Sequence, residues 1–422
     1  MSSNRLFRVL ALCMALAATG EAIAQPGDVE RRRVEGVPED QPRIPEGFSL
    51  PKGVATTMLP PHMRSASGRP AIVLTGYWPP TNESVRRFSP SPTQNPQGWI
   101  GSDWEGRGYD VYAYFPEFTP PNCVACGKGD GDLEVDYQDT SQDFWPIMGG
   151  HDPIAVITFS RGRIDTSWEV ELNQYNRLTW LNDYLAPTQP TPRPPDADVP
   201  QNHLRQSALP TFDIVNAVNN ANLGVNAFLC VSGDGGGFLS EFMAYHGVWY
   251  QALHDSPALP DWCIAGGHIH VGSRIDWMTA RLAVEVTLRT VITYVDSVIA
   301  QNVCQADLGF AGPGAAGLAV CGQALTTGGR ADIALFDAPP FAPAVLAVGP
   351  TFNPRPFVGG VLVPSPVTLT VPAIADADGR VLVKGLLGGG GPFSAYAQCV
   401  YLDGSLPQRV GLTNAVRVDF LQ

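Results

Sequence analysis

Apolar runs alternate with amphipathic patterns along the first two thirds of the chain. Runs of apolar, β-branched and aromatic residues bounded by turn residues predict buried strands, at 71–78, 109–115, 154–160, 226–232 and 268–273. Helical periodicity marks the stretch that begins at Ser240 and a longer one over Trp277–Gln301. Strands that alternate with helices indicate βαβ units. We therefore expect an α/β fold over residues 69–301, with a mostly parallel sheet in three α/β/α layers.

The pattern changes near residue 302. A glycine-rich stretch comes first, and short apolar runs then follow one another with turn residues between them, such as Asp378-Gly379. No helical period intervenes, and this texture is typical of antiparallel strands. We therefore predict a second domain over residues 302–422, an antiparallel β-sandwich with a binding, stabilising or surface-attachment role.

The N-terminus has the pattern of an export signal. Arg5 and Arg8 precede an apolar run, and the stretch AIA at 22–24 offers a small-residue cleavage site. The run is too short to span a bilayer, and no other stretch approaches the required length. We predict a signal peptide over 1–24, a proline-rich leader over 25–68, and a secreted or periplasmic protein without a membrane span.

The charge of the chain narrows the classes of partner. The formal net charge is -13, and it stays negative without the predicted signal. Nucleic acids and anionic membrane surfaces both attract proteins with local positive charge. The composition therefore argues against nucleic acid as a partner.

The cysteines of an exported protein more often form disulfides than metal sites. Cys123 and Cys126 lack two further ligands at zinc-site spacing, so we interpret them as a small loop disulfide. We interpret Cys230 as a structural cysteine, and a disulfide to Cys263 is one pairing that it could form. An acidic run over 130–136 lacks the glycine and terminal glutamate of an EF-hand loop. We accordingly expect no metal and no cofactor.

One serine stands where a glycine-rich loop becomes a helix, in VSGDGGGFLSEFMAYHG at 231–247. Two roles are open to Ser240. Serine commonly provides the N-cap of a helix. Alternatively, Ser240 is a nucleophile, because unpaired backbone N–H groups at a helix start can stabilise an oxyanion. A serine nucleophile also needs a base and a carboxylate that orients the base.

Candidates for both partners lie on or beside the predicted strands. His270 is the first choice for the base, and His268, on the same strand face, is its rival. Glu169 is the first choice for the carboxylate and Glu171 the second. As a His-x-His pair on one strand face, the two histidines could also be metal ligands, a role that we do not favour.

Four stretches resemble segments of pyroglutamyl peptidase I, the pyrrolidone-carboxylate peptidase family of cysteine peptidases. VLTGYWPP at 73–80 is similar to the TGFxPF loop of that family, and SRGRIDTSWEVELN at 160–173 to its GGRxxITxExxxxN segment. SGDGGGFLSEFMAY at 232–245 resembles SxDAGxYLCNxxxY, and HIHV at 268–271 resembles FxHVP. The stretches keep the family's order over roughly residues 70 to 300.

The resemblance implies roles for individual residues. His270 falls on the general base, Glu169 on the acid that orients it, and Ser240 on the nucleophile, which is cysteine in that family. Tyr77 and Trp78 fall on the loop whose aromatic rings hold the substrate. A thiolate is a better nucleophile at neutral pH than an unassisted hydroxyl, so the change from sulfur to oxygen is the main departure.

Two functions follow from the resemblance. The first is a secreted hydrolase that cleaves an N-terminal, pyroglutamyl-type amide bond of a peptide or small amide through Ser240, His270 and Glu169. The alternative is a catalytically inactive homologue that keeps the fold and the cleft and serves as a secreted binding module. Arg177 is the nearest match to an arginine that assists the site in that family.

Overall fold

The computed structural model describes residues 40–50, 68–120, 123, 127–233 and 235–422. The predicted signal peptide and most of the predicted leader lie outside these residues. Asp40–Gln422 form one compact unit. Within the described ranges, no helix has both the length and the apolar character needed to cross a membrane.

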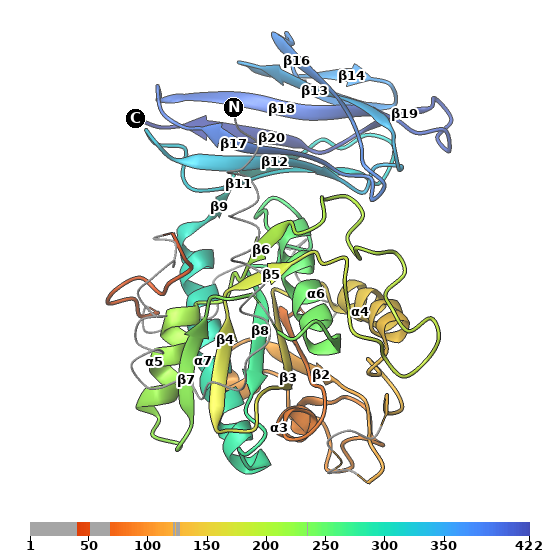
Figure 1. The fold of residues 1–422 in the computed structure, drawn as a ribbon. Coiled ribbons are helices and arrows are strands. Elements are labelled where there is room, and N and C mark those ends of the chain that lie inside the picture. The colour runs from red at the N-terminus through yellow and green to blue at the C-terminus, as the bar shows by residue number, and fades with distance from the viewer. Residues whose placement is uncertain (1–39, 51–67, 121–122, 124–126, 234) are drawn as a thin grey trace, which may run out of the picture. The chain divides into compact units, whose positions relative to one another are not determined.

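A six-stranded, mostly parallel sheet forms the centre of the first part of the chain, as predicted (Figure 1). Its strand order is β2-β1-β3-β8-β4-β7. The first four strands of this order are mutually parallel, whereas β4 is antiparallel to β8 and β7 is parallel to β4. The strands are β1 (Ala71–Thr75), β2 (Asp110–Tyr114), β3 (Ala155–Arg161), β4 (Ser167–Glu171), β7 (Asn226–Cys230) and β8 (Ala265–Val271).

The reversal at β4 was not predicted from the sequence. The connection 162–166 between β3 and β4 is too short to hold the crossover helix that a parallel return requires. The chain therefore returns in the opposite direction, and it does so along the far side of β8. A small antiparallel ladder of β5 (Asn173–Tyr175) and β6 (Leu204–Gln206) follows.

Helices cover both faces of the sheet (Figure 1). Side chains of α3, α5 and α7 pack with Ile72, Ile157 and Ile269 in one buried apolar cluster. Side chains of α4 and α6 pack with Val73 and Val156 in another. Neighbouring strand residues thus point to opposite faces, as the period of two requires. The helices are α3 (Thr81–Val85), α4 (Tyr137–His151), α5 (Thr211–Asn220), α6 (Leu239–Leu253) and α7 (Trp277–Gln301), with short 3-10 turns at Arg86–Phe88 and Trp104–Gly106.

The long helix α7 has the bounds that its periodicity predicts. It begins after Asp276, whose carboxylate accepts hydrogen bonds from the backbone N–H groups of Met278 and Thr279. This N-cap satisfies donors that the first helical turn leaves without a partner. The helix ends at Gln301, and β9 begins at Val303.

The described strands after α7 pair only in antiparallel fashion. One sheet has the order β10-β20-β18-β13-β16, with β19 beside β18, and a second has the order β17-β12-β11-β9. Leu335 of the second sheet shares a buried cluster with Ala344 and Cys399 of the first. The strands are β9 (Val303–Cys304), β10 (Ala306–Gly309), β11 (Gly317–Gly322), β12 (Arg330–Phe336), β13 (Pro343–Gly349), the hairpin β14 (Phe352–Phe357) and β15 (Gly360–Pro364), β16 (Leu369–Ile374), β17 (Val381–Leu387), β18 (Phe393–Leu402), β19 (Val410–Leu412) and β20 (Ala415–Phe420).

The cysteines differ in part from the expected pairing. A disulfide joins Cys304 to Cys321 across β9 and β11. Cys230 and Cys263 are buried free thiols, so the bridge considered for them is not formed. Strand β4 separates β7, which carries Cys230, from β8, which follows Cys263. The predicted Cys123–Cys126 pair lies partly outside the described residues.

His246 gives the fold a dependence on pH. This residue of α6 is completely buried; its Nδ1–H donates to the Phe242 carbonyl at 2.9 Å, and its Nε2 accepts from the Ser141 hydroxyl at 3.1 Å. Burial lowers the pKa of His246 to about 4, against an ordinary value of 6.5. The unfolded chain therefore takes up a proton on this ring as the pH falls below 6.5, while the folded protein resists it down to about pH 4.

Because of His246, we expect the free energy of unfolding to fall by about 3 kcal/mol when the pH is lowered from 7 to 4, at 1.36 kcal/mol per pKa unit. In His246→Phe, which keeps an aromatic ring among Phe144 and Trp145, this loss should disappear. Urea unfolding of the parent and the variant at both pH values measures how much more stability the parent loses. The effect of protonating carboxylates is the same in both proteins and cancels in this comparison. An equal acid loss in the variant would contradict the assignment.

Candidate active site

A patch of polar side chains crosses the sheet on the face that packs against α6. Residues that pair across strands point to the same face. One row runs Thr158, His268, Glu171 and Cys230, and the adjacent row runs Ser160, His270 and Glu169. All of these side chains are buried.

His270 and Glu171 form the central contact of this patch. Nδ1 of His270 donates a hydrogen bond to Oε1 of Glu171 at 2.9 Å, and both side chains are buried. Burial alone would lower the pKa of His270, but the hydrogen bond and the charges of Glu171, Glu169 and Glu241 outweigh it and raise the pKa above its ordinary value. Among the described residues, Nε2 of His270 has no hydrogen-bond partner. That nitrogen is the one able to accept a proton.

Glu169, the first choice for the orienting carboxylate, does not bond to His270. It lies directly opposite His270 in the register of β4 and β8, and Glu171 is the diagonal neighbour that reaches the ring. Burial, followed by the charge of Glu171, raises the pKa of Glu169. The structure thus gives the ring contact to Glu171, the second choice.

His268, the rival base, has both ring nitrogens occupied. Nδ1 lies 2.8 Å from the Thr158 hydroxyl and Nε2 lies 2.9 Å from the Ser160 hydroxyl. Because Thr158 also donates to the Gly267 carbonyl at 3.1 Å, its oxygen accepts from Nδ1–H. Burial and the neighbouring His270 hold the pKa of His268 well below its ordinary value. His268 therefore remains neutral, and its ring packs edge-on against that of His270 with the centroids 4.5 Å apart.

Ser240 is the second residue of α6 and not its N-cap. The N-cap is Phe238, which provides no side-chain hydrogen bond. Ser240 is half-buried in the first turn. No hydrogen bond joins its hydroxyl to His270 in the described part of the chain, and Asp234 of the preceding loop is not described. Among the described residues, the structure therefore does not pair Ser240 with the base.

The loop before α6 is held against His270. A Cβ atom on Gly235 would lie 3.2 Å from Cε1 of His270 and equally close to Cβ of Glu241. Oε2 of Glu241 accepts from the Gly237 N–H at 2.7 Å, and Oε1 forms an ion pair with Arg177. Arg177 also donates to the Gly233 carbonyl at 2.8 Å. This acid and this arginine hold Gly233 and Gly237 of the loop whose Gly235 lies against the imidazole.

The two aromatic residues expected at the substrate wall occupy different environments. Tyr77 is buried in the apolar core, and its hydroxyl bonds to that of Thr140. Trp78 is half-buried and packs between Phe118 and Phe238, with ring centroids 6.4 and 6.2 Å away. Among the described residues, the buried Nε1–H of Trp78 has no acceptor. Trp78 and Phe238 thus stack in one aromatic group, whereas Tyr77 belongs to the buried core.

Sequence reasoning named Glu171 as the second choice but did not predict its contact with His270, nor the contacts of Glu241 with the loop before α6. The alternation of Trp168, Glu169, Val170 and Glu171 is a strand pattern with both glutamates on one face. Together with the His-x-His pattern of β8, it could have indicated two facing polar pairs. The position of Glu241 three residues after Phe238 also fits a residue that bonds back to the loop before its helix.

Comparisons with known proteins return similar solved structures only. No protein-family model matches the chain, and no curated protein is significantly similar. The pyrrolidone carboxyl peptidase of Pyrococcus furiosus is 14% identical, with 53% of this chain and 99% of that chain covered and a TM-score of 0.39. The enzyme of Thermococcus litoralis is 15% identical over 54% of this chain and 95% of that chain, with a TM-score of 0.39.

A third similar structure is pyroglutamyl peptidase I of Bacillus amyloliquefaciens, 15% identical over 54% of this chain and 98% of that chain, with a TM-score of 0.38. Similarity at these values does not define an activity.

Proposed function

We propose that this protein is a secreted hydrolase that cleaves an N-terminal, pyroglutamyl-type amide bond through Ser240, His270 and Glu171. One observation carries the proposal. The buried 2.9 Å hydrogen bond from His270 Nδ1 to Glu171 leaves Nε2 without a partner among the described residues, beside the loop that leads to Ser240. A base held by a carboxylate, with its second nitrogen available, is the arrangement that activates a serine nucleophile.

The reaction would proceed in two stages. The Ser240 hydroxyl attacks the carbonyl carbon, and His270 Nε2 takes the hydroxyl proton while Glu171 holds the imidazolium. Backbone N–H groups in the first turn of α6 would face the oxyanion. His270 then gives its proton to the leaving amine, and the C–N bond breaks to leave an ester on Ser240. Water, deprotonated by His270, hydrolyses that ester and restores the serine.

Substrate binding must bring Ser240 and His270 into contact for this mechanism to operate. Catalytic hydrogen bonds are often long before substrate binds and shorten in the complex. Trp78 and Phe238 would hold the ring of the N-terminal residue, and the Trp78 Nε1–H would donate to a carbonyl oxygen of the substrate. We further propose that the two C-terminal sheets form a β-sandwich that stabilises the protein or binds a surface.

A serine-reactive fluorophosphonate tests the proposal directly. We expect covalent labelling at Ser240, identified by mass spectrometry of the labelled peptide, and loss of labelling in His270→Ala. Ser232→Ala, a change of an exposed serine near the same loop, is the matched control and should keep the label. A folded protein that takes no label at Ser240 would refute the hydrolase and support the non-catalytic binding module, since Ser240 is not hydrogen-bonded to His270 among the described residues.

Ser240→Cys should increase hydrolysis of a pyroglutamyl anilide by roughly tenfold or more. A thiol at a helix N-terminus ionises more readily than a hydroxyl and is the stronger nucleophile at neutral pH. The rate of aniline release measures the gain, and the double variant Ser240→Cys with His270→Ala should lose it. If the single variant shows no gain, the pocket does not accept a pyroglutamyl group.

A further inference from the structure

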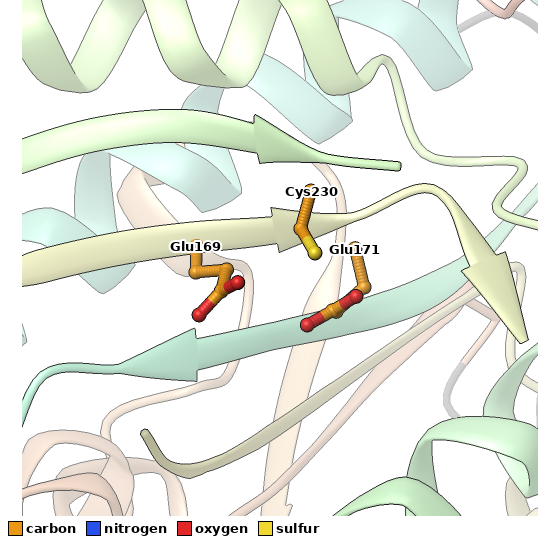
Figure 2. A group of neighbouring side chains, drawn as sticks. All are labelled: Glu169, Glu171 and Cys230. Atoms are coloured by element: carbon orange, nitrogen blue, oxygen red, sulfur yellow. The ribbon is translucent and has the colours of Figure 1, made fainter. Parts of the chain in front are cut away.

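Two carboxylates and a thiol meet behind the histidine of the candidate active site. The ligand atoms of Glu169, Glu171 and Cys230 all lie within 4.8 Å of one another. Figure 2 shows the two carboxylates turned toward each other, with the sulfur of Cys230 beside them. The three residues come from the adjacent strands β4 and β7, and their side chains are 7%, 2% and 3% exposed. A ligand bound there would be almost fully enclosed.

One oxygen of this group lacks a partner. Oε1 of Glu171 accepts the hydrogen bond from His270, but Oε2 is buried with no hydrogen-bond partner among the described residues. A buried carboxylate oxygen is normally hydrogen-bonded or coordinates a cation, because its desolvation is otherwise uncompensated. This oxygen belongs to a side chain that is nearly fully buried and faces Glu169 and Cys230.

The positive groups described nearby leave Oε2 of Glu171 without a hydrogen bond. His270 bonds to one carboxylate oxygen, and Arg177 is engaged by Glu241. A cation bound here would deprotonate the Cys230 thiol and be coordinated by the resulting thiolate.

We propose that Glu169, Glu171 and Cys230 bind a thiophilic divalent cation of the zinc class. A sulfur ligand disfavours magnesium and calcium, which prefer sites made of oxygen alone, whereas zinc accepts a mixture of thiolate and carboxylate. Binding would displace the thiol proton to solvent and form one metal–sulfur and two metal–oxygen bonds. The hydrogen bond from His270 to the other oxygen of Glu171 would remain as outer-shell support.

Cys230 lies close to the edge of the sheet. Sγ of Cys230 lies 3.1 Å from the hydroxyl of Ser232, which is exposed at the end of β7. Strand β7 is the edge strand of the sheet, so no further strand covers this side. The site stands on its own contacts and does not depend on whether Ser240 is a nucleophile.

Cadmium titration of the full chain, with its disulfides intact and after treatment with a chelator that is then removed, tests the proposal. We expect one equivalent of Cd²⁺ to bind with a thiolate-to-metal absorption band in the ultraviolet, and Zn²⁺ to displace it. Cys230→Ser should abolish the band and weaken Zn²⁺ binding beyond the roughly 10- to 100-fold that outer-shell changes cost. Cys399→Ser, which alters another buried free thiol, is the matched control and should bind as the parent does.

A second variant distinguishes the loss of a metal ligand from misfolding. Glu169→Gln keeps the thiol and nearly the same volume, and we expect it to weaken Zn²⁺ binding at least tenfold while circular dichroism remains unchanged. The proposal is overturned if the parent takes up no cation. It is equally overturned if Cys230→Ser or Glu169→Gln, shown to be folded, binds Cd²⁺ and Zn²⁺ as tightly as the parent.

Discussion

Glu171→Gln is expected to lower kcat by about 10⁴-fold, the loss seen when the carboxylate of a serine–histidine–carboxylate triad becomes an amide. An amide NH₂ facing Nδ1 donates to that nitrogen and so forces the ring proton to Nε2, and neither group of the uncharged amide stabilises the imidazolium. His270 Nδ1 now donates to Glu171 at 2.9 Å, so this is the contact that the variant removes. Release of aniline from a pyroglutamyl anilide, at saturating substrate, measures kcat.

Glu169→Gln is the paired comparison for this prediction. Glu169 lies on the same strand and the same face as Glu171, and it is similarly buried, but it does not bond to the ring. We expect its effect on kcat to be the smaller of the two. A larger effect from Glu169→Gln would return the orienting role to the residue that the family resemblance indicates.

Trp168→Ala is expected to reduce the free energy of unfolding by about 3 to 5 kcal/mol, the range for removing a buried aromatic side chain. Trp168 is completely buried on the face of β4 opposite the glutamates and packs against Phe159 with ring centroids 5.7 Å apart. Alanine would leave a large cavity in the cluster beneath α5 and α7. Urea unfolding followed by far-ultraviolet circular dichroism measures the change.

Two variants show whether the loss comes from the cavity. Trp168→Phe should cost less than alanine, because it retains a ring and because the indole N–H has no acceptor among the described residues. Trp277→Ala removes the same side chain from an exposed position at the start of α7 and should change stability by about 0.5 kcal/mol or less. Equal losses at residues 168 and 277 would show that the cluster tolerates the cavity.

The sequence pattern predicts the buried strands and the long helix α7 because each is dictated locally. The runs around Val73, Val156 and Ile269 are apolar whatever their partners, and α7 combines a helical period with a capping aspartate. Strand β4 escaped prediction because its alternation includes two glutamates, which seldom occupy a buried face. Its direction follows from the short loop before it, and its position beside β8 depends on the rest of the sheet.

The sequence predicted the candidate site only in part, because some of its contacts depend on how distant strands pair. Strand alternation places His268 and His270 on one face, and likewise Glu169 and Glu171. Which glutamate reaches which histidine depends on the register of two strands that are about a hundred residues apart in sequence. A residue's local pattern carries no information on that register. The same holds for Tyr77, whose burial depends on α4, a helix that was not predicted.

Strand β4 has a further consequence for how this chain tolerates change in length. Its two sides have opposite chemistry, with Trp168 and Val170 in the apolar cluster and the glutamates toward α6. If one residue were inserted at 162–166 and β4 shifted by one position in register, each of its side chains would move to the opposite face of the sheet. The carboxylates of Glu169 and Glu171 would then enter the apolar cluster, and the indole of Trp168 would face His270. Insertions of two residues preserve the orientation, so length variation in this loop among related chains should favour even numbers.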